Sequence, residues 1–284
     1  MSPKLASKPN DAEDVLNSAD LIEQNPIVHA VTCDGALFRG QCVSKGDTVI
    51  FGKYPQKEHY LEGKLPLERI YPPEPLEWIV FDIKSNGANN RILLLSKYVI
   101  DSYQYDSSHE VVSTHNFHAK VYTMKAWIYP TWAESDIRKW LNETSASGFL
   151  NPSFFATEDQ SLIVEVTHST SDYENYDGGA DTQDKVFLLD RIEVENSALW
   201  PDCSARIAQA TKYALSTGVR SKGNGSGLFG ICKNIECDVG YWLRSPFDRP
   251  GTAAVVDYFG DIRSGDVYET QVGVRPALWV QADK

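Results

Sequence analysis

The chain has 284 residues, of which 42% are hydrophobic and 23% charged, the balance of a globular protein rather than a disordered or fibrous one. Its formal net charge of -12 repels phosphate backbones and anionic membrane surfaces, so we expect no nucleic-acid partner. No apolar run approaches the roughly 20 residues that a membrane helix needs, so we also expect no membrane span.

Residues 1–27 are polar and predict an N-terminal arm or docking helix ahead of a single domain over residues 28–284. One helical face of this segment would carry the apolar side chains of Val15, Leu16, Ala19 and Ile22. The segment lacks the apolar core of a secretory signal, which favours the cytoplasm. The cell surface is the alternative if a leader has been removed.

The cysteines also favour the cytoplasm. There are five, an odd number at irregular spacing, and this suits reduced thiols better than a disulfide framework. They are Cys33, Cys42, Cys203, Cys232 and Cys237.

Short β-like runs separated by turn residues follow the N-terminal segment. We expect strands near Ala30–Cys33 and Thr48–Phe51, with Pro55 ending the second run. Residues 76–83 and 91–101 are two longer apolar runs joined by an Asn-Gly turn, so they predict a buried sheet centre.

The middle of the chain carries helical patterns. Ile137, Trp140 and Leu141 follow Ser135 at helical spacing, and a second helix is expected with its cap at Thr157. Residues 185–190 predict a strand, and residues 191–218 are expected to be mostly helical. From Gly223 onward, short β segments alternate with Gly, Asp, Pro and Ser turns.

An acidic loop over residues 171–184 crowds carboxylates around Gly178 and Gly179, as flexible Ca²⁺ sites do. The Ca²⁺ candidates are Asp177, Asp181 and Asp184, with Asp172 and Glu174 nearby. The spacing is not that of an EF-hand, and turns or caps explain the same residues. His115 and His118 are a further possible ligand pair, although their polar neighbours favour an ordinary loop.

Three separated stretches carry a resemblance. They are GDTVIFGKYPQ with PLEWIVFDI (46–56 and 75–83), GGADTQDKVFLLD (178–190), and YWLRSP with VGVRPALW (241–246 and 272–279). In this order they resemble a bacterial C-type-lectin-like family related to formylglycine-generating enzymes, which includes variable proteins of diversity-generating retroelements. The resemblance implies an α+β fold with small antiparallel sheets, two or more helices and long loops.

The resemblance also implies a ligand-binding segment over residues 247–271, between framework residues Trp242, Arg244, Gly273 and Arg275. Within the segment, Ala253–Val256 fit a packed strand, whereas the polar and aromatic residues suit solvent or a partner. The candidate contacts are Phe247, Asp248, Arg249, Asp257, Tyr258, Asp261, Arg263, Asp266, Tyr268 and Glu269. An ordinary hydrophilic surface is the alternative.

These observations predict a non-enzymatic protein that binds a protein or other macromolecular ligand without a cofactor, on a segment that a retroelement would diversify. An enzyme of the formylglycine-generating type is the alternative. The paired cysteines of those enzymes would map between the two C-terminal motifs, where this chain has none, and Cys232 and Cys237 precede both motifs. A sensor or regulatory subunit that docks through residues 1–27 is the third possibility.

Overall fold

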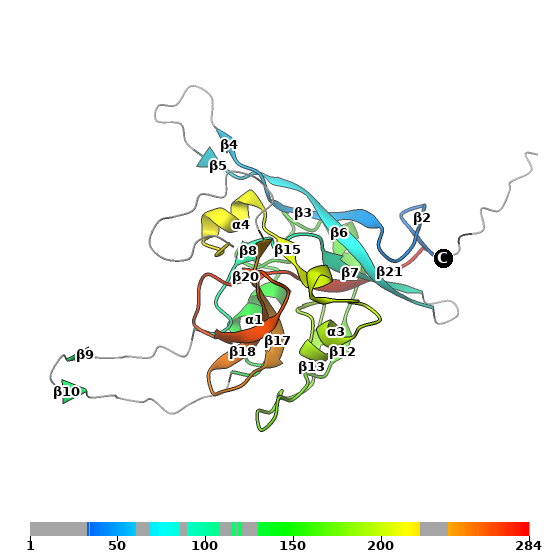
Figure 1. The fold of residues 1–284 in the computed structure, drawn as a ribbon. Coiled ribbons are helices and arrows are strands. Elements are labelled where there is room, and N and C mark those ends of the chain that lie inside the picture. The colour runs from blue at the N-terminus through cyan, green and yellow to red at the C-terminus, as the bar shows by residue number, and fades with distance from the viewer. Residues whose placement is uncertain are drawn as a thin grey trace, which may run out of the picture. The chain divides into compact units, whose positions relative to one another are not determined.

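The apolar runs predicted to form a sheet centre pair with the C-terminal strand in the computed structural model, which describes residues 33, 35–60, 69–85, 90–107, 115–116, 119–120, 130–221 and 238–283. Strand β21 (Ala277–Gln281) pairs with β7 (Arg91–Ser96), which continues to β6 (Pro73–Lys84) and β3 (Thr48–Pro55) (Figure 1). On its other side β21 pairs with β11 (Ile163–Val164) and β14 (Val186–Phe187). Every pairing in this six-stranded sheet is antiparallel.

A second sheet has the order β19 (Ile262–Asp266), β18 (Thr252–Val256), β17 (Tyr241–Pro246), β20 (Gly273–Val274) and β8 (Asp101–Ser102). Only β17 and β20 pair in parallel. Five two-stranded ribbons accompany the sheets in the described residues. They are β1 (Ala36–Phe38) with β2 (Gln41–Val43), β4 (His59–Tyr60) with β5 (Arg69–Ile70), β9 (His115–Asn116) with β10 (Ala119–Lys120), β12 (Val166–His168) with β13 (Thr182–Asp184), and β15 (Ala208–Gln209) with β16 (Asp238–Val239).

The helices are short. They are α1 (Asp136–Asn142), α2 (Thr157–Leu162), α3 (Arg191–Glu195), the 3₁₀ helix η1 (Cys203–Arg206) and α4 (Lys212–Thr217). The predicted helix behind Ser135 is confirmed as α1, with Ser135 as its N-cap. The cap of α2 is Ala156 rather than Thr157, and residues 191–218 form three separate short helical segments instead of a mostly helical stretch.

The predicted α+β C-type-lectin-like fold is wrong. Of the residues that the structure describes, 40% are strand and 14% helix, and the sheets curl into half-barrels. The helical patterns in the sequence produce only one or two turns each. Within residues 191–218, Pro201 interrupts the pattern, and Asp202 and Thr211 are the N-caps at which new short segments begin. The strand predictions fare better, since Thr48–Phe51 lies in β3, which ends at Pro55, and the two apolar runs form β6 and β7.

The core is anchored by three fully buried tryptophans whose indole N–H groups all find acceptors. Trp78 donates to Phe51 O at 2.7 Å, Trp132 to Asp184 Oδ2 at 2.9 Å, and Trp242 to Tyr103 O at 2.9 Å. A buried indole without an acceptor would lose the free energy of its bond to water. These bonds therefore let large aromatic side chains fill the core without a polar penalty.

Two strand pairs carry the chain from one sheet to the other. Strands β7 and β21 pair in the six-stranded sheet, and their neighbours in sequence, β8 and β20, pair in the five-stranded sheet. Ser96 N donates to Pro276 O at 2.9 Å and Ile100 N donates to Val274 O at 2.9 Å, so the two crossings run side by side. The two sheets are thus parts of one compact unit, Cys33–Lys284.

Some sequence predictions lie outside the described residues. These are the N-terminal arm over 1–27, most of the strand at Ala30–Cys33, the Asn-Gly turn, His118, and both Cys232 and Cys237. Among the described residues, no helix has the length and apolar character required to cross a bilayer.

Candidate functional site

The segment predicted to bind ligand, residues 247–271, forms a hairpin at the edge of the five-stranded sheet. Strand β18 is buried along its whole length and pairs with β17 on one side. Strand β19 pairs with β18 from Thr252↔Asp266 to Val256↔Ile262 and is the outer strand of the sheet. The predicted packed strand at Ala253–Val256 is thereby confirmed, and it supports polar residues in the turns at both ends.

The first cluster of candidate residues is the turn over residues 257–261. The Asp257 carboxylate accepts hydrogen bonds from the backbone N–H groups of Phe259 at 2.8 Å and Asp261 at 3.0 Å. Gly260 has φ +82° and lies so close to η1 that an added Cβ would be 1.8 Å from Cys203 O. Glycine is therefore required here for both its conformation and its lack of a side chain.

Aromatic and cationic side chains surround this turn. Phe259 is 50% exposed, and its ring lies 4.5 Å from that of the half-buried Tyr258. Arg263 donates to Asp261 Oδ2 at 2.9 Å and approaches Asp257 Oδ2 at 3.5 Å. The turn thus presents the exposed ring of Phe259 on a backbone that the Asp257 carboxylate holds in place.

The second cluster lies at the other end of the hairpin. Arg249 donates to Asp266 Oδ1 at 2.8 Å, and Tyr268 Oη donates to Oδ2 of the same carboxylate at 3.1 Å. Ser264 donates to Asp248 Oδ1 at 2.7 Å. Asp266 therefore orients the guanidinium and the phenol together, while the Tyr268 ring stays 44% exposed.

Phe247 does not join either cluster. Its ring stacks on Tyr173 in the acidic loop, with centroids 4.4 Å apart and planes inclined by 29°. The Arg191 guanidinium lies 5.1 Å from the centroid of Tyr173 and completes this group. The structure therefore divides the ten candidate residues among three places, and Glu269 takes part only through its backbone bond to Asp266 O.

Two of the four framework residues depend on close packing. Trp242 is fully buried beneath Gly265, where an added Cβ would lie 2.7 Å from the indole ring. Gly273 lies against Val99, whose Cγ1 would be 2.2 Å from an added Cβ. These contacts position β19 and β20 close to their neighbours, so the framework residues determine where the hairpin lies.

The two arginines of the framework are buried in separate places. Arg275 lies where the chain crosses between sheets and donates from Nε to Ser96 O at 2.9 Å and from Nη1 to Tyr241 Oη at 3.3 Å. Arg244 instead donates from Nη1 to Leu188 O and to Glu193 Oε2, both at 2.8 Å. These bonds place the two arginines in separate networks.

Asp190 joins the Arg244 network and begins α3. The Asp190 carboxylate accepts hydrogen bonds from Ser171, Ser245 and Ile192. The backbone N–H of Asp190 donates to the Glu193 carboxylate, which completes a capping box. Burial alone would raise the pKa of the Asp190 carboxyl, but the Arg244 guanidinium and the Ser171 hydrogen bonds outweigh it and hold this pKa below its ordinary value. The group is therefore charged and structural.

The acidic loop uses its carboxylates as local acceptors. Asp172 accepts from Gly178 N at 2.8 Å and Asp177 from Gly179 N at 2.7 Å. Asp184 is fully buried and accepts from Arg138 Nε at 2.7 Å as well as from Trp132. Because Asp184 is already paired, it is a poor Ca²⁺ ligand, and the described part of the chain holds no group of three candidate metal ligands.

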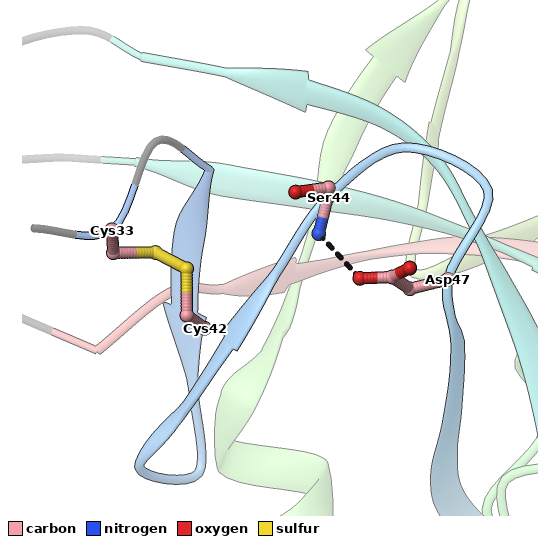
Figure 2. The surroundings of a disulfide bond; sticks show 4 residues. All are labelled: Cys33, Cys42, Ser44 and Asp47. Carbon is pink, nitrogen blue, oxygen red and sulfur yellow. Dashed lines mark hydrogen bonds between the residues drawn. A yellow bond between two sulfur atoms is a disulfide. The ribbon is translucent and has the colours of Figure 1, made fainter. Parts of the chain in front are cut away.

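The cysteine prediction is wrong for one pair. Cys33 and Cys42 form a disulfide with Cα atoms 5.6 Å apart, which ties the start of the compact unit to β2 (Figure 2). The adjoining turn is held by Ser44 N, which donates to Asp47 Oδ2 at 2.8 Å. Cys203 is a free, exposed thiol. The spacing of the cysteines in the sequence could not predict this disulfide, because Cys33 and Cys42 approach each other only when β1 and β2 pair.

Sequence reasoning missed two aromatic residues at this surface. Phe259 follows Asp257 and Tyr258 in a DYFGD turn, and an aromatic residue beside a turn glycine has no strand in which to be buried. That signal would have found it. Tyr173 gave no such signal, because its contact with Phe247 joins positions 74 residues apart in the chain.

Comparison with known proteins gives one match. A family model described as a domain of unknown function (DUF6273) matches residues 89–282, which is more than half of the chain. No curated protein and no solved structure matches.

Proposed function

The chain belongs to the DUF6273 family of domains of unknown function, and we propose from its geometry that it is a non-enzymatic protein that binds a protein ligand through the β18–β19 hairpin. The observation that carries the proposal is the exposure of Phe259 on a turn that is already held in place. Large apolar rings at the surface are typical of protein interfaces, where they contribute much of the binding free energy.

The rigidity of the turn supports the same proposal. Association costs conformational entropy when a contact loop must become ordered, and a preorganised loop avoids much of that cost. Here the Asp257 carboxylate fixes two backbone N–H groups, and Gly260 packs against Cys203 O. A partner would therefore meet Phe259 in a conformation that needs little adjustment.

The separation of the exposed rings favours a macromolecule over a small molecule. Phe259 and Tyr268 lie beyond opposite ends of a paired stretch that spans four residue steps, from Ile262 to Asp266. At ~3.3 Å per step this stretch is ~13 Å long. A protein interface of ordinary size covers that distance, whereas a single amino acid or monosaccharide does not.

The enzyme alternative has no feature of the described residues in its favour. The interval 247–271 has no cysteine, and Cys203, the one free thiol in the described residues, has no second cysteine beside it among them. Diversification of the hairpin by a retroelement and docking through residues 1–27 stay predictions.

For the compartment, we propose an oxidising one in place of the cytoplasm. A disulfide in the first ribbon is stable outside the reducing cytosol and would be lost within it. The test is the mass of protein from its native host after alkylation without reductant. Unmodified Cys33 and Cys42 support the proposal, and alkylation of both would refute it.

The binding proposal is tested by screening wild type against an array of purified surface and secreted proteins and then repeating each hit with Phe259→Ala and Tyr268→Ala. We expect the double variant to lose about 2 kcal/mol or more of binding free energy. The matched control is Tyr60→Ala, an equally exposed aromatic residue on the separate β4–β5 ribbon. Equal binding by the double variant and by the control would remove the hairpin as the binding surface.

A further inference from the structure

A cavity of about 500 Å³ opens beside the six-stranded sheet, away from the β18–β19 hairpin. One wall is the sheet, through Lys84, Arg91 and Trp279, and the other includes the β12–β13 ribbon and β17, through His168, Gln183 and Arg244. We call it the Trp279 pocket. Its volume is within the range of small-molecule sites in proteins.

The floor of the pocket is an indole ring covered by two cations. Trp279 is opposite Leu93 in β7 and opposite Val164 in β11, so it lies at the middle of the sheet, and it is 7% exposed. Lys84 Nζ is 4.9 Å and Arg91 Cζ is 5.7 Å from the centroid of its ring. Cation–π attraction holds both charges over the same ring.

The two cations are also direct cross-strand partners. Lys84 pairs with Arg91 in the β6–β7 register, and like charges at opposed positions destabilise a sheet. Across the ranges that the structure describes, neither side chain forms an ion pair with a carboxylate. Asp82, which lies on β6 with Lys84, pairs with Lys45 instead. Cation–π attraction to Trp279 offsets part of this repulsion, and an anion bound between the two charges would offset the rest.

The deep wall offers a second, independent observation. His168 is 8% exposed and Arg244 is 4% exposed, and both line the pocket. His168 Nε2 and Arg244 Nε are buried without a hydrogen-bond partner, although Arg244 Nε forms an ion pair with Asp190 Oδ2 at 3.8 Å. Buried polar atoms in folded proteins are nearly always paired, so two such nitrogens on one cavity wall indicate a missing acceptor.

The remaining polar side chains determine which anion fits. The exposed residues Glu165, Thr167 and Gln183 form the rim of the pocket, together with the half-buried Glu193, which is already paired with Arg244. The Gln183 amide donates to the Thr167 hydroxyl at 2.6 Å. Carboxylates repel an anionic group but accept hydrogen bonds from hydroxyls. The ligand therefore needs an anionic end toward the cations and hydroxyl groups toward the rim.

Charge decides between a carboxylate and a phosphate. Three cationic side chains and two carboxylates line the pocket, which leaves one net positive charge while His168 is neutral. Burial and the nearby Arg244 guanidinium lower the pKa of His168 to about 4, so it is neutral near pH 7. One carboxylate balances this charge, whereas a phosphate monoester carries nearly two negative charges.

We propose that the Trp279 pocket binds a sugar acid, with its carboxylate between Lys84 and Arg91 and its hydroxyl groups bonded to the rim. The His168 ring, in the tautomer with a proton on Nε2, donates to the same ligand from the deep wall. This site is separate from the β18–β19 hairpin, and its existence does not depend on the function proposed for that hairpin.

The test is calorimetric titration of the full chain with four probes: glucuronate, galacturonate, gluconate and N-acetylneuraminate. We expect at least one to bind, and the double variant Lys84→Gln with Arg91→Gln to weaken that binding by about tenfold or more. Glucose tests the need for the carboxylate and inorganic phosphate tests the class of anion, so both should bind about tenfold more weakly than the best acid.

The matched control is Lys57→Gln with Arg69→Gln, which removes two exposed cations that do not line the pocket and should leave sugar-acid binding unchanged. Because Lys84 is exposed, the single variant Lys84→Gln should fold normally and serves if the double variant does not. The proposal is overturned if none of the four acids binds at about 10 mM, if phosphate binds more tightly than all of them, or if the Lys84 and Arg91 variants bind as wild type does.

Discussion

The guanidinium of Arg244 donates to Glu193 Oε2 at 2.8 Å, and this ion pair joins the centre of the five-stranded sheet to the first turn of α3. Arg244 also faces Asp190, the cap of that helix, inside the protein. The same side chain thus links β17, α3 and the wall of the Trp279 pocket.

Loss of this guanidinium is expected to be costly. Arg244→Met would leave the Asp190 carboxylate buried without its main positive neighbour, and breaking a buried pair in this way costs about 3–5 kcal/mol. Arg249→Met removes an exposed ion pair with Asp266 and should cost about 1 kcal/mol or less. Urea unfolding of both variants measures the difference, and similar losses would contradict the structural role assigned to Arg244.

His168 gives the protein a defined response to acid. The pKa of its ring is about 4 in the folded state and near 6.5 when unfolded, so between these values the unfolded chain binds the extra proton. Above pH 6.5 the ring is neutral in both states, and its titration does not affect the free energy of unfolding. As the pH falls from 6.5 toward 4, protonation of the unfolded chain lowers this free energy by about 3 kcal/mol in total.

The measurement is the free energy of unfolding at several pH values between 7 and 4, in wild type and in His168→Gln. The variant should show a shallower decline over this window, since only the contribution of His168 is removed. Parallel curves for the two proteins would show that His168 titrates normally in the folded state.

Gly265 tests the packing of the hairpin on Trp242. In Gly265→Ala the new Cβ would be 2.6 Å from Val255 Cγ2 and 2.7 Å from the indole ring, so we expect a loss of about 1–3 kcal/mol from overpacking. Gly251 is the control, because its Cβ would meet nothing within 4 Å and only its positive φ of +73° opposes alanine, at about 1 kcal/mol. Thermal unfolding should show the larger shift for Gly265→Ala.

The disulfide is expected to stabilise the compact unit by a moderate amount. Its two cysteines are 9 residues apart, and the loop-closure estimate for so short a loop is about 2–3 kcal/mol. The double variant Cys33→Ser with Cys42→Ser should lower the free energy of unfolding by this amount and become insensitive to reductant. Wild type that unfolds identically with and without reductant would contradict the prediction.

Local sequence patterns predicted the local parts of this structure well. The helix α1 follows from Ser135 and the spacing of Ile137, Trp140 and Leu141, because caps and apolar faces act within one or two turns. Strands β6 and β7 follow from their apolar runs for the same reason.

Long-range relationships were beyond the sequence. The predicted fold class was wrong because it was based on a resemblance and on helical patterns. The sheets depend instead on pairings between strands that are far apart in the chain, such as β21 with β7. The Trp279 pocket was missed for the same reason. Arg91, His168, Arg244 and Trp279 come from four separate strands, and each has an ordinary local environment in the sequence.

The position of β21 between β7 on one side and β11 and β14 on the other has a consequence for biosynthesis. All three partners leave the ribosome before β21 does, as do β8 and β17 before β20. Until residues 273–281 emerge, both sheets lack an inner strand, and the apolar edges beside the gap stay exposed. Neither sheet can therefore complete its pairing until residues 273–281 have been synthesised, however early the strands on either side of the gap become available.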